Sequence, residues 1–187
     1  MPLLKHYILL AEYNQLMNQR QCKAASKLSV EELNEDKKAF FKSILGTLNH
    51  ILVGDIIWLK RFAQLPICKE HLLYFTELEK PKSLDILLFQ NLDEFKFERE
   101  KVDSLIVNWV RNLSDETLDQ CLPYQNMVGK IFNKPLSSLI NHLFLHQVHH
   151  RGQITTLFSQ YSIDFGETDL LEIIEECNAE QVHESRS

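Results

Sequence analysis

The segment from about Lys37 to Gln64 restricts the possible fold of this chain more than any other. Its apolar residues recur at spacings of three and four, which predicts one long helix. The main apolar stripe of this helix consists of Phe40, Phe41, Ile44, Leu48, Ile51, Leu52, Trp58, Leu59 and Phe62. Val53, Ile56 and Ile57 add apolar surface on its other sides. Because little of this helix can face water, we expect it at the centre of a helical bundle or in a subunit interface.

The same periodicity predicts three more long helices, at about residues 4–27, 92–113 and 135–161. Glycine and proline, which interrupt helices, are scarce, with 5 of each in the chain. Before the last of these helices, two short apolar segments flank Val128-Gly129, as in a small β-hairpin. Ser29 and Glu32 form a capping box for a short turn of helix. Thr168 is expected to cap a final helix from Asp169 to about Glu176.

These elements predict an all-α fold. We expect a four-helix bundle with a small β-hairpin before the fourth long helix and a short C-terminal helix. Residues 1–176 form one domain in this interpretation, and residues 177–187 form a frayed C-terminal tail. The chain contains no internal repeat and no low-complexity linker.

The charge and the cysteines limit the partners and the compartment. Acidic residues outnumber basic residues, 26 to 20, for a formal net charge of −6. The basic residues are scattered among acids rather than gathered on one face, so we expect no nucleic-acid partner. No apolar run reaches the roughly 18 residues of a membrane-spanning helix, and the first residues lack a signal-peptide pattern, so we expect no membrane partner. The 4 cysteines form no C-x-x-C pair, which favours buried, reduced thiols and a cytoplasmic location.

The predicted fourth long helix contains three histidines in five residues, His146, His149 and His150. His146 and His150 are four residues apart, so both point the same way, one turn above the other. His150 falls within the apolar stripe and His146 at its edge, whereas His142 and His149 lie toward the polar side. A histidine that faces a core needs a partner for each ring nitrogen. The pair is therefore open to two interpretations, hydrogen bonding to neighbouring helices or binding of a metal ion.

Three polar residues, one beside this pair and two in the second long helix, bear on the reactions and ligands that the site could have. Gln147 stands where a zincin protease has its catalytic Glu, and an amide cannot act as a base, which argues against that class. Asp55 lies in the apolar stripe of the second long helix, where an unpaired carboxylate is costly. We expect it to pair with an arginine, for which Arg151 is a candidate, or to orient a ligand histidine. His50 lies off that stripe, and periodicity alone does not select it as a ligand.

Several motifs together resemble the DinB family, named for DNA-damage-inducible bacterial proteins. The resemblance covers about residues 7–176. It rests on Tyr13-Asn14 with Asn18, Gly46-Thr47-Leu48-Asn49-His50, Asp55, Trp58-Leu59-Lys60-Arg61-Phe62, Asn126-Met127 with Gly129, His149-His150-Arg151-Gly152-Gln153 and Thr168-Asp169-Leu170-Leu171. The chain departs from the family at Leu145 and Val148, where members often have Asn and Thr. This departure makes the rim of the site more apolar and leaves the ligand positions intact.

The resemblance implies an up-down-down-up four-helix bundle, usually a homodimer, in which three histidines hold a divalent metal. Carried over position by position, the metal ligands are His50, His146 and His150. This adds to the histidine pair a third ligand that periodicity does not select. Nickel and zinc both suit imidazole ligands, so the metal is one of the two. Three histidines leave at least one coordination position open, as in catalytic zinc sites.

The resemblance also implies an activity, because relatives of this fold include enzymes that transfer low-molecular-weight thiols. The first hypothesis is a metal-dependent thiol S-transferase-like enzyme, in which a thiol is held as thiolate and attacks an electrophilic small-molecule substrate. The alternatives are a metal-dependent hydrolase and a non-enzymatic, stress-related metal-binding dimer.

Four polar residues are candidates for binding the substrate. Asn14 and Asn18 would contact a polar substrate if the first helix faces the site, and Arg151 or Arg61 would balance a carboxylate. Spacing alone instead favours a solvated face for the two asparagines and ordinary surface or salt-bridge roles for the two arginines.

Overall fold

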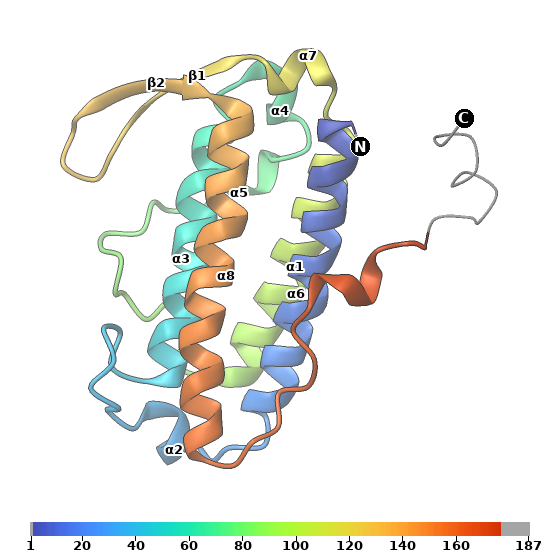
Figure 1. Ribbon diagram of the computed structural model, residues 1–187. Coiled ribbons are helices and arrows are strands. Elements are labelled where there is room, and N and C mark those ends of the chain that lie inside the picture. Colours follow the sequence, from blue (N-terminus) through green and yellow to red (C-terminus); the bar gives the residue numbers. More distant parts are fainter. Residues whose placement is uncertain (1, 177–187) are drawn as a thin grey trace.

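A computed structural model describes residues 2–176 and contains four long helices that run side by side (Figure 1). Helix α1 (Leu3–Ala25) packs against α6 (Leu92–Arg111), and α3 (Ile44–Phe62) packs against α8 (Leu136–Gln160). Helix α8 also contacts α1, which closes the bundle around one core. In Figure 1, α1 and α8 run in one direction and α3 and α6 run in the other. The predicted up-down-down-up four-helix bundle is therefore confirmed.

Short elements connect the four long helices. Helix α2 (Val30–Asn34) precedes α3, and α4 (Pro66–Lys69) and α5 (Leu73–Glu77) lie in the long connection between α3 and α6. Helix α7 (Asp115–Leu118) leads into an antiparallel hairpin of β1 (Cys121–Gln125) and β2 (Ile131–Pro135), which directly precedes α8 as predicted. A 3-10 helix, η1 (Leu170–Ile173), lies near the end of the described chain.

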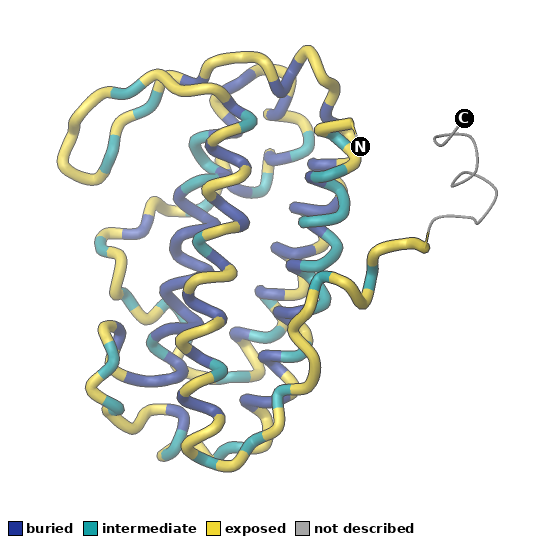
Figure 2. The backbone as a smooth tube through the Cα atoms, in the orientation of Figure 1, coloured by how far each residue is buried: buried dark blue, intermediate teal, exposed yellow. Residues whose placement is uncertain are grey.

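The core lies between the four long helices, whose mutually facing sides are buried (Figure 2). Its largest fully buried side chains include Trp109, Phe62, Phe95 and Phe158, which come from three different helices. Helix α3 is buried along most of its length within this single chain. Of the two positions that the sequence allows for this helix, the centre of a bundle is the one observed.

The start of α3 differs from the prediction. The helix begins at Ile44 rather than near Lys37, because the Ser43 hydroxyl caps it by accepting a hydrogen bond from the Gly46 amide. Lys38 and Lys42 have φ angles of 57° and 65°, which no right-handed helix contains. Phe40, predicted in the apolar stripe, is consequently 87% exposed.

The C-terminal segment also differs from the prediction. The expected helix from Asp169 to Glu176 is only the 3-10 turn η1, and Thr168 does not cap it, because Asp169 is the N-cap residue and makes no side-chain cap. The segment has no buried face that would stabilise a longer helix, since none of the residues in η1 is buried. The Tyr13 hydroxyl instead holds it by donating to the Thr168 carbonyl. The predicted frayed tail, residues 177–187, lies outside the described residues.

The cysteines agree in part with the expected buried thiols. Cys22 and Cys68 are free and buried, whereas Cys121 is free and exposed on β1. Burial raises the pKa of the Cys22 thiol to about 12, which leaves it unreactive at neutral pH. Cys177 lies outside the described residues. No helix within residues 2–176 is both long and apolar enough to span a membrane.

Candidate metal centre

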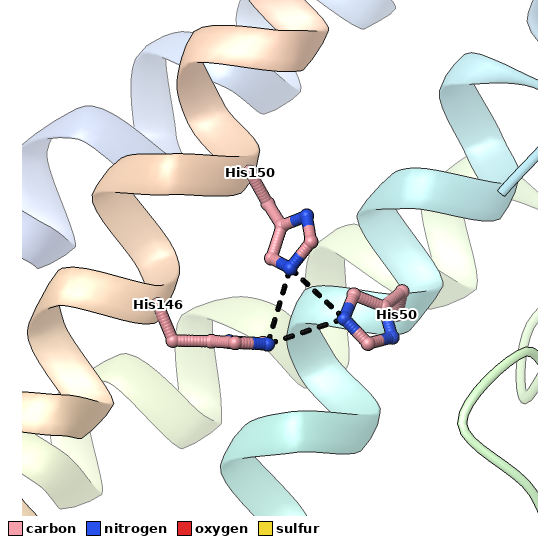
Figure 3. A group of neighbouring side chains, drawn as sticks. All are labelled: His50, His146 and His150. Atoms are coloured by element: carbon pink, nitrogen blue, oxygen red, sulfur yellow. Dashed lines mark hydrogen bonds between the residues drawn. The ribbon is translucent and has the colours of Figure 1, made fainter. Parts of the chain in front are cut away.

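Three histidines from two helices meet between α3 and α8 (Figure 3). His50 projects from α3, and His146 and His150 project from successive turns of α8. The Nε2 atom of His50 lies 3.2 Å from that of His146 and 3.1 Å from that of His150, and the last two are 3.1 Å apart. The structure thus places the predicted ligands together, including the one that periodicity does not select.

The connection between α3 and α6 orients His50. Asn49 holds this connection against α3, because its side-chain amide donates to the Phe89 carbonyl at 3.0 Å and its oxygen accepts from the Phe89 amide at 2.9 Å. The Leu84 carbonyl then lies 2.8 Å from His50 Nδ1. A carbonyl oxygen only accepts, so His50 Nδ1 carries the proton and Nε2 presents a lone pair.

His150 has the same tautomer for a similar reason. Its Nδ1 lies 2.8 Å from the side-chain oxygen of Gln153, one turn further along α8. The Nε2 lone pairs of His50 and His150 therefore face each other at 3.1 Å, and two lone pairs at that distance repel unless a cation lies between them.

The spacing of the three nitrogens fits a single metal ion. Nitrogens that each lie about 2.0–2.1 Å from one ion, at angles between 90° and the tetrahedral angle, are about 2.8–3.4 Å apart. The three observed distances fall inside this interval. Neutral imidazoles in this arrangement are suited to a borderline divalent ion such as nickel or zinc.

Gly54 makes room for His146. A Cβ atom added at this glycine would lie 2.9 Å from Cε1 of His146, which is closer than real Cβ atoms approach. The gap at Gly54 thus accommodates the imidazole of His146 on the facing helix. The His146 Nδ1 atom is buried and has no hydrogen-bond partner among the described residues.

The three imidazoles are neutral at physiological pH. Burial, followed by the charges of the neighbouring histidines, lowers the pKa of His146 to about 3. Burial also lowers the pKa of His150 to about 4 and lowers that of His50. The ring of Phe41 stacks on His50 with 3.6 Å between centroids and covers one side of the site. Neutral imidazole is the form that binds a metal ion.

A pocket of about 330 Å³ opens beside the histidines. His50 and His146 line it together with Trp58 and Arg61 of α3, and the hairpin loop at residues 126–128 forms its outer wall. The Arg61 guanidinium lies over the Trp58 ring, 4.5 Å from its centroid, and donates to the Gln125 carbonyl at 3.0 Å. A small molecule in this pocket would touch both His50 and His146 and the positive charge of Arg61.

Asp55 is buried and paired, but its partner is not the one expected. Its carboxylate forms an ion pair with Arg99 of α6 at 2.5 Å and accepts from the Gln147 amide at 2.7 Å. Arg151 is not among its hydrogen-bond or salt-bridge partners, and Asp55 makes no hydrogen bond to a ligand histidine within the described residues. The signal that would have identified this pair is Arg99 itself, a charged residue inside the apolar seam of the third long helix.

The expectation of a solvated face for Asn14 and Asn18 is wrong, because both side chains are buried. Asn18 donates to Asp103 at 2.9 Å, and Asn14 accepts from Arg151. Their face of α1 packs against α6 and α8, and buried amides require such partners. Neither asparagine lines the pocket beside the histidines, and neither does Arg151.

Comparisons with known proteins identify the family and the fold. The DinB family matches residues 3–176. Protein DinB of Bacillus subtilis (strain 168) is 25% identical over 166 residues, which cover 86% of this chain and 88% of that protein. The crystal structure of a DinB-like protein from Bacillus cereus ATCC 10987 superposes with a TM-score of 0.57 at 21% identity, covering 88% of this chain and 94% of the other. Since the family match extends over nearly the whole described chain, this protein is a member of the DinB family.

Proposed function

We propose that this protein binds one divalent metal ion, nickel or zinc, through His50, His146 and His150 and transfers a low-molecular-weight thiol to an electrophilic small molecule. The observation that carries the proposal is the convergence of three Nε2 atoms beside a pocket large enough for such a reactant. A divalent ion held by these histidines would lower the pKa of a bound thiol and so supply a thiolate at neutral pH. As the sulfur forms its bond to the electrophilic carbon, the bond from that carbon to its leaving group, such as a halide, would break, and the thiol proton and the leaving group would pass to solvent.

The residues of the pocket would bind and orient the thiol. Arg61 supplies a positive charge that favours a thiol carrying a carboxylate, and Trp58 supplies an apolar wall. Met127 and Val128, from the hairpin loop, add apolar surface to the lining. Of the two arginines considered from the sequence, Arg61 is the one that lines this pocket.

The hydrolase alternative has less support. Metal-assisted hydrolysis uses a general base that takes a proton from water, and no aspartate or glutamate lines the pocket among the described residues. Asp55, on the same helix as His50, is fully buried and hydrogen-bonded to Arg99 and Gln147, so it is not free to act as that base. The thiol hypothesis needs no such base, because the metal itself favours the deprotonated nucleophile.

A homodimer is part of the proposal. Leu145 and Val148 are 59% and 44% exposed on the outer side of α8, where a second copy would cover them. The expectation from the sequence that these two residues make the rim of the site more apolar is wrong, because neither lines the pocket beside the histidines. The non-enzymatic alternative uses the same dimer as a binding platform and differs only in lacking turnover.

An assay of thiol consumption tests the activity. The metal-loaded protein would be incubated with a panel of low-molecular-weight thiols and a halogenated nitroarene, and we expect thiol loss above the uncatalysed rate. His146→Ala should abolish it, whereas His149→Ala, which changes an exposed histidine of the same helix, should not. Equal rates for the wild type and His146→Ala, with every thiol tested and with stoichiometric metal in the wild type, would contradict the thiol-transfer proposal.

A further inference from the structure

A second pocket lies on the other side of α8 from the histidines. At 100° per residue, Val148, Gly152 and Thr155 project from the side of the helix opposite to His146 and His150, and Arg151 projects between the two sides. These four residues line a cavity of about 190 Å³, which α1 and the segment after α8 complete. This cavity shares no lining residue with the pocket beside the metal ligands.

Arg151 is a buried cation with unused donors in this cavity. Its side chain is only 5% exposed, and its Nη1 donates to Asn14 and, at 3.4 Å, to Gln147. Within the described residues its Nε and Nη2 have no hydrogen-bond partner, and no carboxylate lies within salt-bridge distance of the guanidinium. Neither nitrogen is fully enclosed by protein, so both can be reached from the cavity. The carboxylates of Asp103 and Asp55 act on the guanidinium only from beyond salt-bridge distance, which leaves a direct ionic partner to be supplied by a ligand.

The residues that line the cavity indicate which kind of ligand would pair with the positive charge of Arg151. No acidic residue lines it among the described residues, so the positive charge of Arg151 is not balanced there. Met17, Val148 and Phe165 make much of the wall apolar. Phe165 and Thr168 belong to the segment after α8, which the Tyr13 hydroxyl holds in place by donating to the Thr168 carbonyl. The cavity is therefore small, mostly apolar and positive at one point.

We propose that this cavity binds a small carboxylate with a compact apolar body, whose two oxygens accept hydrogen bonds from Nε and Nη2 of Arg151. The planar guanidinium matches a carboxylate with two parallel hydrogen bonds. A single arginine balances one negative charge, and the apolar walls favour a carbon skeleton over the further oxygens of a phosphate. This site would be independent of the metal centre and of the thiol transfer proposed for it.

Benzoate is a suitable probe, because it joins one carboxylate to a compact apolar ring. Titration into the full-length protein, followed by backbone amide shifts in ¹H–¹⁵N spectra, should give saturable changes centred on Tyr13, Gly152 and Thr155. Benzamide, which has the same shape without the charge, and inorganic phosphate should give none at matched concentration. Arg151→Gln should raise the benzoate Kd by about tenfold or more, since it removes the charged, two-point contact.

Two further variants keep the test decisive. Replacing the buried Arg151 could disturb the fold. Gly152→Leu avoids this, because it leaves Arg151 in place and fills the cavity with a side chain. The Cβ atom of this side chain would meet no atom within 4 Å. Gly152→Leu should also abolish benzoate binding. Arg61→Gln should leave binding unchanged. If Arg61→Gln lost benzoate binding while Gly152→Leu kept it, benzoate would bind in the pocket beside the histidines, and the proposal would be overturned. Tighter binding of phosphate than of benzoate would also overturn it. So would the absence of benzoate binding by the folded wild type.

Discussion

The side-chain amide of Gln147 donates a 2.7 Å hydrogen bond to the carboxylate of Asp55, which joins α8 to α3 one residue away from His146. The same carboxylate pairs with Arg99 of α6, and Arg99 also pairs with Asp103, at 2.8 Å. Asp103 in turn accepts a hydrogen bond from the side-chain amide of Asn18 on α1. A continuous buried polar network thus links all four long helices, including the two that carry His50, His146 and His150.

Replacing Asp55 should therefore destabilise the fold strongly. Asp55→Ala leaves the Arg99 guanidinium with one buried carboxylate instead of two and leaves Gln147 without its acceptor, and such losses cost about 3–5 kcal/mol. Urea denaturation followed by circular dichroism measures the free energy of unfolding. Asp93→Asn, at an exposed position on α6, is the control and should cost less than about 1 kcal/mol. A loss as small as that of the control would mean that the network does not hold the helices together.

Removing any one of the three histidines should abolish stoichiometric metal uptake without unfolding the protein. Each imidazole supplies one of three nitrogens to the same point, while the core around Trp109 and Phe62 does not depend on them. Elemental analysis of the natively purified His50→Ala variant measures its metal content. His149→Ala is the control and should keep its metal. If His50→Ala instead lost its helical circular dichroism, His50 would be a structural core residue rather than a ligand.

Gly54→Ala should weaken metal binding while the helix remains intact. The added methyl group would lie 2.9 Å from the His146 ring and displace it, and a displaced ligand lowers metal affinity by about 10- to 100-fold. Gly152→Ala is the matched control, because it is also a glycine in a long helix but has open space around it. Competition with a chromogenic chelator measures both affinities. Equal affinities for the two variants would show that His146 does not need the gap at Gly54.

The metal-free protein should lose stability as the pH falls from about 6.5 toward 4. Burial lowers the folded-state pKa of His146 to about 3 and of His150 to about 4, while in the unfolded chain both return to about 6.5. Below pH 6.5 the unfolded state therefore binds more protons than the folded state, and the free energy of unfolding decreases with decreasing pH. Urea denaturation across this range should show a shallower decrease for a His146→Gln, His150→Gln double variant. Identical slopes would contradict the proposed burial of these imidazoles.

Local patterns were sufficient to predict most of the fold. Helix periodicity depends only on residues three and four positions apart, so the four long helices, the hairpin before α8 and the pairing of His146 with His150 could all be predicted from spacing. The ends of elements were less predictable. The start of α3 depends on the left-handed conformations of Lys38 and Lys42, which nothing in the surrounding composition indicates.

Contacts between distant segments could not be derived from spacing, because the same apolar stripes allow many relative rotations of packed helices. His50 lies off the main stripe of its helix, and it was the family resemblance, not the periodicity, that selected it as the third ligand. Asp55 was expected inside the bundle, but its partner is Arg99 on α6 and not Arg151, which faces α1 instead. The residue pattern established that these polar groups needed partners, since burial makes unpaired charge costly, and the packing of the four helices determined which partners they found.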